Sequence, residues 1–266
     1  MNICDKTADA SCKGQCLQQE ALAFGTVPSD RTVLVTGGAR RIGRAICEAL
    51  SSRGWRVIVH ARRPDDPDAA ELAKRIGGLS VAADLSEPLA AVRLFQQVCD
   101  IAPNLCAIVN NAAIFSSAAE MEPKFAALIR RVNAEVPEKL TALLGLRLME
   151  HPPFSGAVVD LLDCRVLPSS PSGVADTPYL ESKRLLRASM VKSAGLFASC
   201  LRVNAVAPGP VLAPSDPAVR ISGGDILLSA RPTPRDIAEA VAYLLDAPAV
   251  TGQVLAVDSG QSLLLV

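Results

Sequence analysis

From Thr32 onward, short β-branched apolar runs alternate with longer stretches of helical spacing, and this pattern restricts the fold more than any other feature. Such alternation is typical of βαβ units, in which parallel strands form one sheet and helices cover both of its faces. Helical spacing is clear in Ile42–Arg53 and Pro88–Cys99. The predicted strands are Thr32–Thr36, Arg56–His60, Leu79–Ala83, Cys106–Asn110, Ala157–Leu161, Ser199–Asn204 and Val254–Val257. The sequence therefore predicts one α/β domain, residues 31–266, built on a doubly wound parallel sheet.

The residues before this pattern, 1–30, are polar and lack periodicity, so we expect a flexible N-terminal tail. Cys4, Cys12 and Cys16 lie in this tail, but their spacing fits none of the common zinc patterns and no histidine is near. We therefore expect no metal site.

Charge and composition argue against several classes of protein. The 27 Lys and Arg residues balance 27 Asp and Glu residues, whereas binding to nucleic acid favours a basic excess. No apolar run approaches the ~18 residues of a membrane span, and the N-terminus lacks the pattern of a signal peptide. The eight cysteines are spread along the chain, which favours reduced thiols. We expect a cytoplasmic protein that binds neither nucleic acid nor membrane.

A glycine-containing turn joins the first predicted strand to the first predicted helix, in the segment Thr36-Gly37-Gly38-Ala39-Arg40-Arg41-Ile42-Gly43. A turn in this place points backbone N–H groups at a bound diphosphate, and the helix N-terminus adds partial positive charge. Ligands bind at the carboxyl ends of the strands in such sheets. The turn is therefore a candidate dinucleotide site, with an ordinary connection as the alternative.

The spacing Thr36-Gly37-x-x-x-x-x-Gly43 resembles the short-chain dehydrogenase/reductase family. That family usually has a third glycine between these two, and Arg41 replaces it here, as in the pteridine reductase branch. The resemblance runs from about Arg31 to Ser262. It implies a Rossmann-type fold and a nicotinamide cofactor held by a turn that includes Gly37, Ile42 and Gly43.

The end of the second predicted strand favours NADPH over NADH. NAD-dependent enzymes commonly place an acidic residue there to hold the ribose 2′-hydroxyl, but this chain has no acid before Asp65. Arginine attracts a 2′-phosphate and can bind it with two hydrogen bonds. We expect a group of basic residues at the 2′-phosphate, any of which could instead be a solvated surface charge: Arg62 or Arg63, His60, Arg40 and Arg41.

Four further segments match the family in order along the chain. Asp84-Leu85 resembles the pair that contacts the adenine, and Asn110-Asn111-Ala112-Ala113 resembles the family's NNAG motif, which places Asn111 and Ala112 at the cofactor. Asn133 matches a helical asparagine that holds a water in a proton relay. Pro208-Gly209 resembles the contact with the nicotinamide.

Tyr179 and Lys183 carry the strongest signal for chemistry. Residues four apart on a helix share one face, so the phenol and the ammonium point the same way. A nearby positive charge lowers the pKa of a tyrosine from about 10 and eases its proton exchange. The pair resembles the family's active site, in which the lysine also holds the nicotinamide ribose.

The third catalytic position departs from the family's usual serine. When the predicted strand Ala157–Leu161 is aligned with the family's strand, the serine position falls on Asp163, 16 residues before Tyr179. This alignment requires an extension in the loop Leu167–Gly173. Without the extension the position falls on Val166, and Asp160 is the other acidic candidate. Pteridine reductases also carry Asp here, and a carboxyl group suits the N–H groups of a pterin. A solvated or helix-capping Asp163 is the alternative.

Phe115 matches an aromatic residue that stacks on the pterin ring in pteridine reductases, although a core or lid side chain is nearly as good an interpretation. The substrate would then contact Phe115, Arg41, Asp163 and Tyr179. We expect Glu181 and Ser182 to lie on the helix surface, and the cysteines of the domain to be small apolar side chains.

The sequence thus predicts an NADPH-dependent reductase of a pterin, such as dihydrobiopterin, dihydromonapterin or a dihydrofolate-like compound. The alternatives are reduction of another carbonyl group, such as a 3-oxoacyl group, or a non-catalytic NADPH-binding regulator. Because members of this family are usually tetramers or dimers, we expect self-association through the helices Ala134–Met149 and Tyr179–Phe197, with the apolar C-terminus as a second contact.

Overall fold

A seven-stranded parallel sheet with the strand order β3-β2-β1-β4-β5-β6-β7 forms the centre of the molecule. The computed structural model describes residues 31–116, 122–151, 155–167, 177–212 and 226–264. The strands are β1 (Thr32–Val35), β2 (Arg56–Ala61), β3 (Leu79–Ala82), β4 (Leu105–Asn110), β5 (Gly156–Leu161), β6 (Leu201–Pro208) and β7 (Val254–Val257). The predicted Rossmann-type fold is confirmed.

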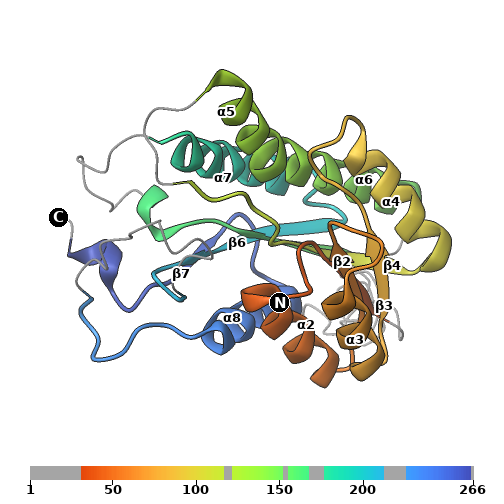
Figure 1. The fold of residues 1–266 in the computed structure, drawn as a ribbon, viewed down its shortest axis with the longest axis horizontal. Coiled ribbons are helices and arrows are strands. Elements are labelled where there is room, and N and C mark those ends of the chain that lie inside the picture. Colours follow the sequence, from red (N-terminus) through yellow and green to blue (C-terminus); the bar gives the residue numbers. More distant parts are fainter. Residues whose placement is uncertain (1–30, 117–121, 152–154, 168–176, 213–225, 265–266) are drawn as a thin grey trace, which may run out of the picture.

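Helices cover both faces of the sheet, as Figure 1 shows. The longer ones are α2 (Arg41–Ser52), α3 (Pro67–Arg75), α4 (Ala90–Ile101), α5 (Pro123–Arg130), α6 (Val136–Glu150), α7 (Pro178–Leu196) and α8 (Pro234–Asp246). The short ones are the π-helical turn η1 (Arg131–Glu135) and the 3₁₀ turns η2 (Cys164–Val166) and η3 (Gln261–Leu263).

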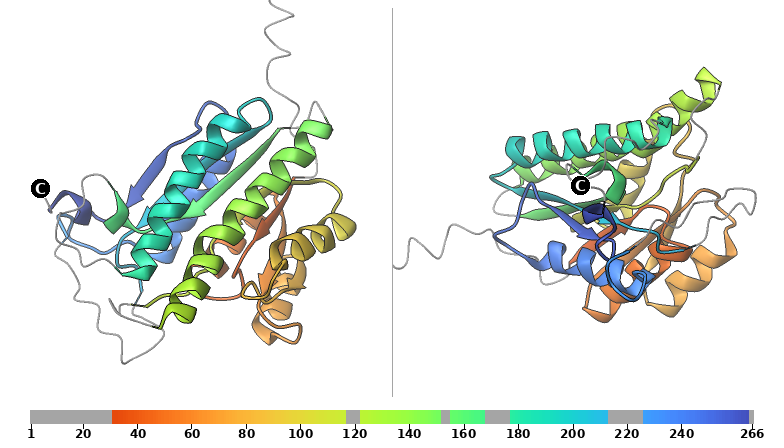
Figure 2. Two further views of the ribbon diagram at one scale, coloured as in Figure 1. Left: turned by 90° about the horizontal axis from the view of Figure 1, so that it is seen from above. Right: turned by 90° about the vertical axis from the view of Figure 1, so that its left-hand side faces the viewer.

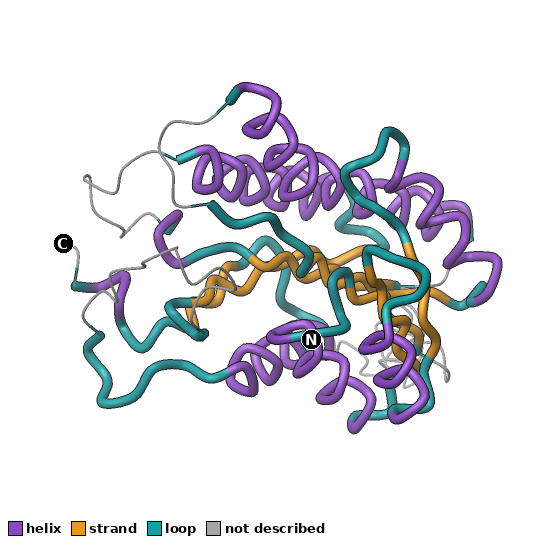
Figure 3. The backbone as a smooth tube through the Cα atoms, viewed as in Figure 1, coloured by secondary structure: helices purple, strands orange, loops and turns teal. Residues whose placement is uncertain are grey.

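The core consists of two layers, one on each face of the sheet, and Figure 3 shows the strands lying between them. On one face α4, α6 and α7 bury Leu94, Leu144 and Leu186 against the sheet. On the other face α2, α3 and α8 bury side chains such as Ile46 and Val241. Viewed from above, α6 and α7 lie side by side over the sheet (Figure 2). Burial on both faces explains why the strands are almost wholly apolar.

Several predicted element boundaries differ from the structure, most clearly those of β6 and α4. β6 begins two residues later than expected and continues to Pro208, because residues Ala205–Pro208 pair with β7 on its far side. α4 begins at Ala90 rather than Pro88, because Leu89 adopts a left-handed conformation with φ +60. The predicted tail, residues 1–30, lies outside the described residues.

In the part of the chain that the structure describes, no helix has both the length and the apolar character needed to cross a membrane.

Candidate active site

The turn between β1 and α2 is held by two glycines and one asparagine. Gly37 has φ +61, a conformation that glycine adopts without a steric penalty. A Cβ atom on Gly43 would collide with the Gly37 carbonyl oxygen and lie 2.7 Å from Asn111 Nδ2. The Asn111 amide donates to the carbonyl oxygens of Thr36 and Gly37, at 2.9 and 3.0 Å. The turn is therefore close-packed and preorganised.

The geometry of this turn fits a diphosphate. The first N–H groups of α2, including those of Ile42 and Gly43, face outward from the helix N-terminus without intrahelical acceptors. The positions of Gly37 and Gly43 form a cradle that side chains would fill. Arg41, in the family's glycine position, has φ +54, a conformation uncommon for a residue with a Cβ atom. The residues present therefore suit a dinucleotide.

His60, in β2, holds this turn through a hydrogen bond to Gly37. Its ring is buried, and Nδ1 accepts a hydrogen bond from the Gly37 N–H at 3.0 Å. Nε2 lies 3.0 Å from the Ala83 carbonyl oxygen and donates to it in the matching tautomer. Burial lowers the pKa of His60 to about 4, so the ring is neutral at pH 7. Both ring nitrogens have protein partners, so His60 holds the turn in place, and the expectation that it lies at the 2′-phosphate as a basic group is wrong.

The arginines predicted at the 2′-phosphate lie at the same end of the sheet. Arg62 is exposed and donates to Asp84 at 2.8 Å. Arg40 forms ion pairs with Asp66 and Asp68 at the start of α3. Arg63 is exposed. These contacts place basic groups around the ends of β2 and β3, and their contact with a 2′-phosphate stays a prediction.

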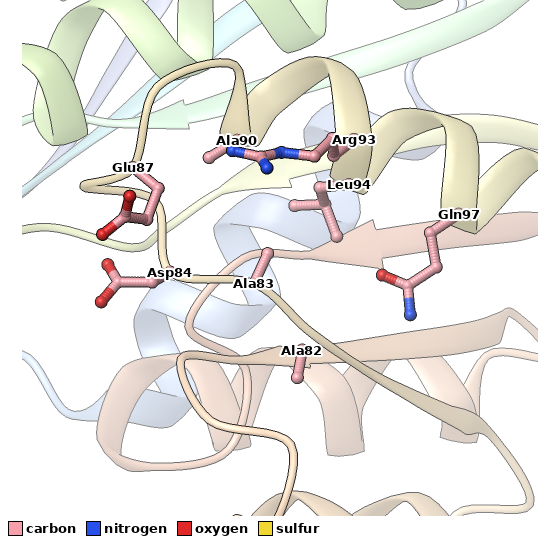
Figure 4. Close-up of a pocket in the computed structure, with 8 residues that line it drawn as sticks. All are labelled: Ala82, Ala83, Asp84, Glu87, Ala90, Arg93, Leu94 and Gln97. Carbon is pink, nitrogen blue, oxygen red and sulfur yellow. The ribbon is translucent and has the colours of Figure 1, made fainter.

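A hollow of about 380 Å³ lies between the end of β3 and α4. Figure 4 shows the side chains of Asp84 and Glu87 on one side of it and Gln97 further along α4. Leu85, the predicted partner of Asp84, is buried in the core. None of the catalytic candidates lines this hollow, whereas Asp84, predicted to contact the adenine, does.

The π-helical turn η1 presents Asn133 to the chain that follows β4. Asn133 is fully buried; its Oδ1 accepts from the Ile114 N–H at 2.8 Å, and its Nδ2 donates to the Ile114 carbonyl oxygen at 2.9 Å. Nδ2 also donates to Ser182 Oγ at 3.1 Å. Asn133 therefore fixes the segment next to Phe115, and its part in a proton relay stays a prediction.

Tyr179 and Asp163 meet at the carboxyl end of β5. The Tyr179 hydroxyl donates to Asp163 Oδ2 at 3.3 Å. Val166 is buried in the core, and Asp160 is buried within β5 and accepts from Asn110 Nδ2 at 2.8 Å. Of the three positions considered from the sequence, the structure brings Asp163 to the phenol. Asp163 also caps η2 by accepting from the Arg165 N–H, so the capping role is present as well.

Lys183 lies one turn along α7 from Tyr179, with Nζ 5.8 Å from the centre of the phenol ring. Its ammonium donates to the Leu161 carbonyl oxygen at 2.6 Å. Burial lowers the pKa of Lys183 to about 8, while the carboxylates of Asp163 and Asp160 act in the opposite direction. Lys183 can therefore exchange a proton at Nζ near neutral pH.

Phe115 packs its edge against Tyr179, with ring centres 4.8 Å apart and planes at 71°. An aromatic pair of this geometry is favourable. Phe115 is partly buried, so one part of the ring packs on the core and the rest borders the site.

Comparison with known proteins agrees with this geometry. Residues 37–262 match the family model described as enoyl-(acyl carrier protein) reductase. The chain belongs to the short-chain dehydrogenase/reductase family. A FolM alternative dihydrofolate reductase 1 from Brucella canis, solved in complex with NADP, is 32% identical, with a TM-score of 0.77; the match covers 90% of this chain and 96% of that chain.

Two curated relatives differ in substrate. A dihydromonapterin reductase of Enterobacter sp. (strain 638) is 26% identical over 90% of this chain and all of its own length. A provisionally named ketoacyl reductase 2 of the granaticin polyketide synthase, from Streptomyces violaceoruber, is 31% identical over 89% of this chain and 98% of its own length. The chain is thus an oxidoreductase of this short-chain family with relatives of both kinds.

Sequence reasoning missed one charged residue at the centre of this family site. The Arg165 guanidinium donates from Nε and Nη2 to the two oxygens of Asp163, each at 2.8 Å, and lies 5.8 Å from the centre of the Tyr179 ring. The only signal in the sequence is its place two residues after Asp163, which does not by itself predict an ion pair.

Ser182 corrects another expectation, because it is buried rather than on the helix surface. It donates to the Tyr179 carbonyl oxygen at 2.6 Å and accepts from Asn133, so it ties α7 to η1. Glu181 is exposed, as expected. The segment after β6, predicted to contact the nicotinamide, is tightly packed, since a Cβ on Gly209 would lie 2.7 Å from Asp258 Cα. Pro208 ends β6 opposite Val257.

No group of three or more potential metal ligands occurs among the described residues.

Ala112, which was predicted to contact the cofactor, is partly buried and lies against the glycine turn. A Cβ atom on Gly37 would lie 3.1 Å from the Cα atom of Ala112.

Proposed function

We propose that this chain reduces a pterin or dihydropteridine with NADPH. The observation that carries the proposal is the Asp163 carboxylate beside the Tyr179 hydroxyl, where the family usually has serine. A carboxylate accepts hydrogen bonds from the amino and ring N–H groups of a pterin, which a serine would do less well. The FolM alternative dihydrofolate reductase and the dihydromonapterin reductases among its relatives support this choice.

NADPH rather than NADH is supported by charge at the adenosine end. Arg62 and Arg63 follow β2 where an acidic residue would select NADH, and Arg40 forms ion pairs with Asp66 and Asp68 at the start of α3. The proposed cofactor residues are Gly37, Arg40, Arg41, Ile42, Gly43, Arg62, Arg63, Asp84, Leu85, Asn111, Ala112, Lys183, Pro208 and Gly209. The Brucella canis FolM protein was crystallised with NADP, which agrees with this selection.

When bound, the nicotinamide supplies a hydride. The chain's own residues supply the proton and the orientation: Tyr179 donates its hydroxyl proton to the ring nitrogen next to the reduced carbon. Asp163 orients the pterin edge, and Phe115 offers an aromatic face. Lys183 holds the ribose, while Asn133 fixes the backbone of Ile114 beside the site.

Reduction of another carbonyl group is the second candidate. The granaticin ketoacyl reductase is among the more similar relatives. Asp163 and Arg41 argue against it because both depart from the general family pattern. A non-catalytic NADPH-binding regulator would not need Tyr179 and Lys183 together.

An NADPH-oxidation screen tests the proposal. The panel contains dihydrobiopterin, dihydromonapterin, dihydrofolate, a 3-oxoacyl thioester and simple ketones, each also tried with NADH. We expect turnover of at least one pterin, with kcat/KM highest for NADPH. Preference for a 3-oxoacyl substrate would support the second candidate, and a preference for NADH would contradict the cofactor assignment.

Three variants separate the proposed roles. Tyr179→Phe should lower kcat roughly 10²–10⁴-fold while NADPH binding is kept, because only the proton donor is lost. Lys183→Ala should weaken both NADPH binding and turnover. Asp163→Ser should reduce pterin turnover more than ketone turnover; equal losses would remove the carboxylate from pterin recognition.

The proposed setting is a homotetramer or homodimer in the cytoplasm. The five cysteines among the described residues form no disulfide with one another, which suits a reducing compartment. Apolar side chains exposed on α6 and α7 support association through these helices.

A further inference from the structure

The catalytic centre contains a second cation besides Lys183. Arg165 lies in η2, and its side chain is 28% exposed. It binds both oxygens of Asp163 through Nε and Nη2, the two-bond geometry in which guanidinium groups hold carboxylates most firmly. The backbone N–H of Arg165 donates to Asp163 as well, at 3.0 Å. Three hydrogen bonds from one residue therefore fix this carboxylate.

The same guanidinium acts on Tyr179. Burial raises the pKa of Tyr179 well above its usual value, and the negative charge of Asp163 raises it further. Arg165, with its central carbon 5.8 Å from the ring centre, lowers it. An uncompensated carboxylate beside the phenol would oppose loss of the hydroxyl proton. A family member with serine in this position has no such charge to compensate.

Other titratable groups near this pair come from several elements. Cys164 follows Asp163 directly, and burial raises the pKa of its thiol to about 12, so it stays neutral. Lys183 on α7 and Asp160 on β5 are buried near the site, and the charge of Asp160 raises the pKa of Lys183. Asp258, after β7, faces Cys164. Arg165 is the cation that directly contacts the Asp163 carboxylate.

We propose that Arg165 is a positioning residue of the catalytic centre, which holds the Asp163 carboxylate in place and offsets its charge at Tyr179. This assignment rests on the proposed roles of Asp163 and Tyr179, and it explains how the chain can combine an acidic residue with a proton-donating phenol. Without this counter-ion, the Asp163 carboxylate would be free to turn from the substrate and would hinder proton exchange at Tyr179.

A titration without substrate tests the charge compensation. The chain has two tyrosines, so Tyr243→Phe leaves Tyr179 as the only phenol. Phenolate absorbance is followed as the pH is raised from about 9, below the pKa of about 10 of free tyrosine, over the range in which circular dichroism shows each protein to be folded. In this background we expect phenolate to appear at a lower pH in Asp163→Asn than in the parent, and at a higher pH in Arg165→Met. Arg165→Lys, which keeps the charge, should lie between Arg165→Met and the parent. An onset at the same pH in the parent, Arg165→Met and Asp163→Asn would overturn the proposal.

A double-mutant cycle tests whether Arg165 acts through Asp163. The assay uses the substrate that the enzyme reduces with NADPH, whether that is a pterin or a ketone. Arg165→Met should lower kcat/KM about tenfold to a hundredfold, which is the loss expected when one charge-assisted hydrogen bond is removed. The same change in an Asp163→Asn background should cost much less. Arg75→Met, an exposed arginine on α3, is the matched control and should leave kcat/KM unchanged. Equal losses in both backgrounds would overturn the role.

These outcomes are separable from failure of the proposed function. If the enzyme reduces ketones and no pterin, the titration and the cycle still give an answer for Arg165. If pterins are reduced but Arg165→Met matches the parent, pterin reduction stands and the role of Arg165 does not.

Discussion

At the scale of single residues, the glycine turn leaves no room for a methyl group at position 43. A Cβ atom there would press on the Gly37 carbonyl oxygen and on Asn111. We expect Gly43→Ala to abolish NADPH binding while the fold persists, because the clash distorts the turn at the diphosphate. Fluorescence titration with NADPH measures this. Gly195→Ala is the control, since nothing lies within 4 Å of a Cβ there. Unchanged affinity in Gly43→Ala would contradict a cofactor at this turn.

Asp160 is a buried acid whose ionisation opposes folding. Burial raises its pKa from 3.8 to about 7, although Asn110 and Lys183 act in the opposite direction. The Asn110 Oδ1 atom is buried without a hydrogen-bond partner among the described residues. A protonated Asp160 supplies a donor that could satisfy this oxygen, which fits a carboxyl group that prefers to be neutral.

The direction of the pH effect follows from that raised pKa. Below about pH 4 the carboxyl group is protonated in both the folded and the unfolded chain, whereas between the two pKa values only the unfolded chain ionises freely. The stability due to the protonated form is therefore lost as pH rises through about 7. Asp160→Asn should raise the Tm more at about pH 8 than at about pH 5. The exposed Asp100→Asn should show no such difference, and a pH-independent gain in Asp160→Asn would show that Asp160 ionises normally.

The sequence predicted individual site residues where a family spacing exists, and failed where a contact depends on local folding. Tyr179, Lys183 and Asp163 follow from their spacing along β5 and α7, and the structure brings Asp163 and Tyr179 together. The Arg165 ion pair depends on the 3₁₀ turn after Asp163, which no periodicity indicates. Ser182 was expected on the surface, but a π-helical turn, with no sequence signature, places Asn133 against it.

At the scale of elements, α7 depends on a threonine cap that lies next to the catalytic tyrosine. The Thr177 side chain accepts from the Leu180 N–H at 3.2 Å. Thr177→Ala should cost about 1 kcal/mol of stability and also lower kcat, because the first turn of α7 carries Tyr179. Thr233→Ala removes a similar cap from α8, so it should cost comparable stability with little effect on kcat. Parallel losses of activity in the two variants would contradict a local effect at Tyr179.

The elements themselves were predictable because burial on both sides of a parallel sheet leaves clear apolar runs. All seven strands were expected at or near their observed positions. The errors fall where pairing or backbone geometry overrides the pattern: β6 extends because β7 pairs with it, and α4 starts late because Leu89 is left-handed. Both depend on neighbours distant in sequence or on a single dihedral angle, and neither leaves a signal in hydrophobic spacing.

At the scale of the whole molecule, apolar side chains remain uncovered at the C-terminal ends of α6 and α7. Leu146 and Met149 on α6 are each 54% exposed, and Val191 and Leu196 on α7 are 53% and 66% exposed. The two helix ends are joined by Phe197, whose ring packs on Gly145 with no room for a Cβ. Exposed apolar side chains on two helices that pack together suit a two-fold interface, because the same surface can pair with itself.

We expect light scattering at micromolar concentration to show a dimer or tetramer, and Val191→Glu to shift it toward smaller species by placing a charge in the apolar face. Leu89→Glu is the matched control, because Leu89 is 73% exposed, lies just before α4 and should leave the assembly unchanged. NADPH binding should survive in dissociated Val191→Glu, since the glycine turn lies at the strand ends and not on this surface. A monomeric parent protein would contradict self-association. Dissociation of both variants would show that the added charge disrupts the assembly wherever it is placed, and would contradict an interface on α6 and α7.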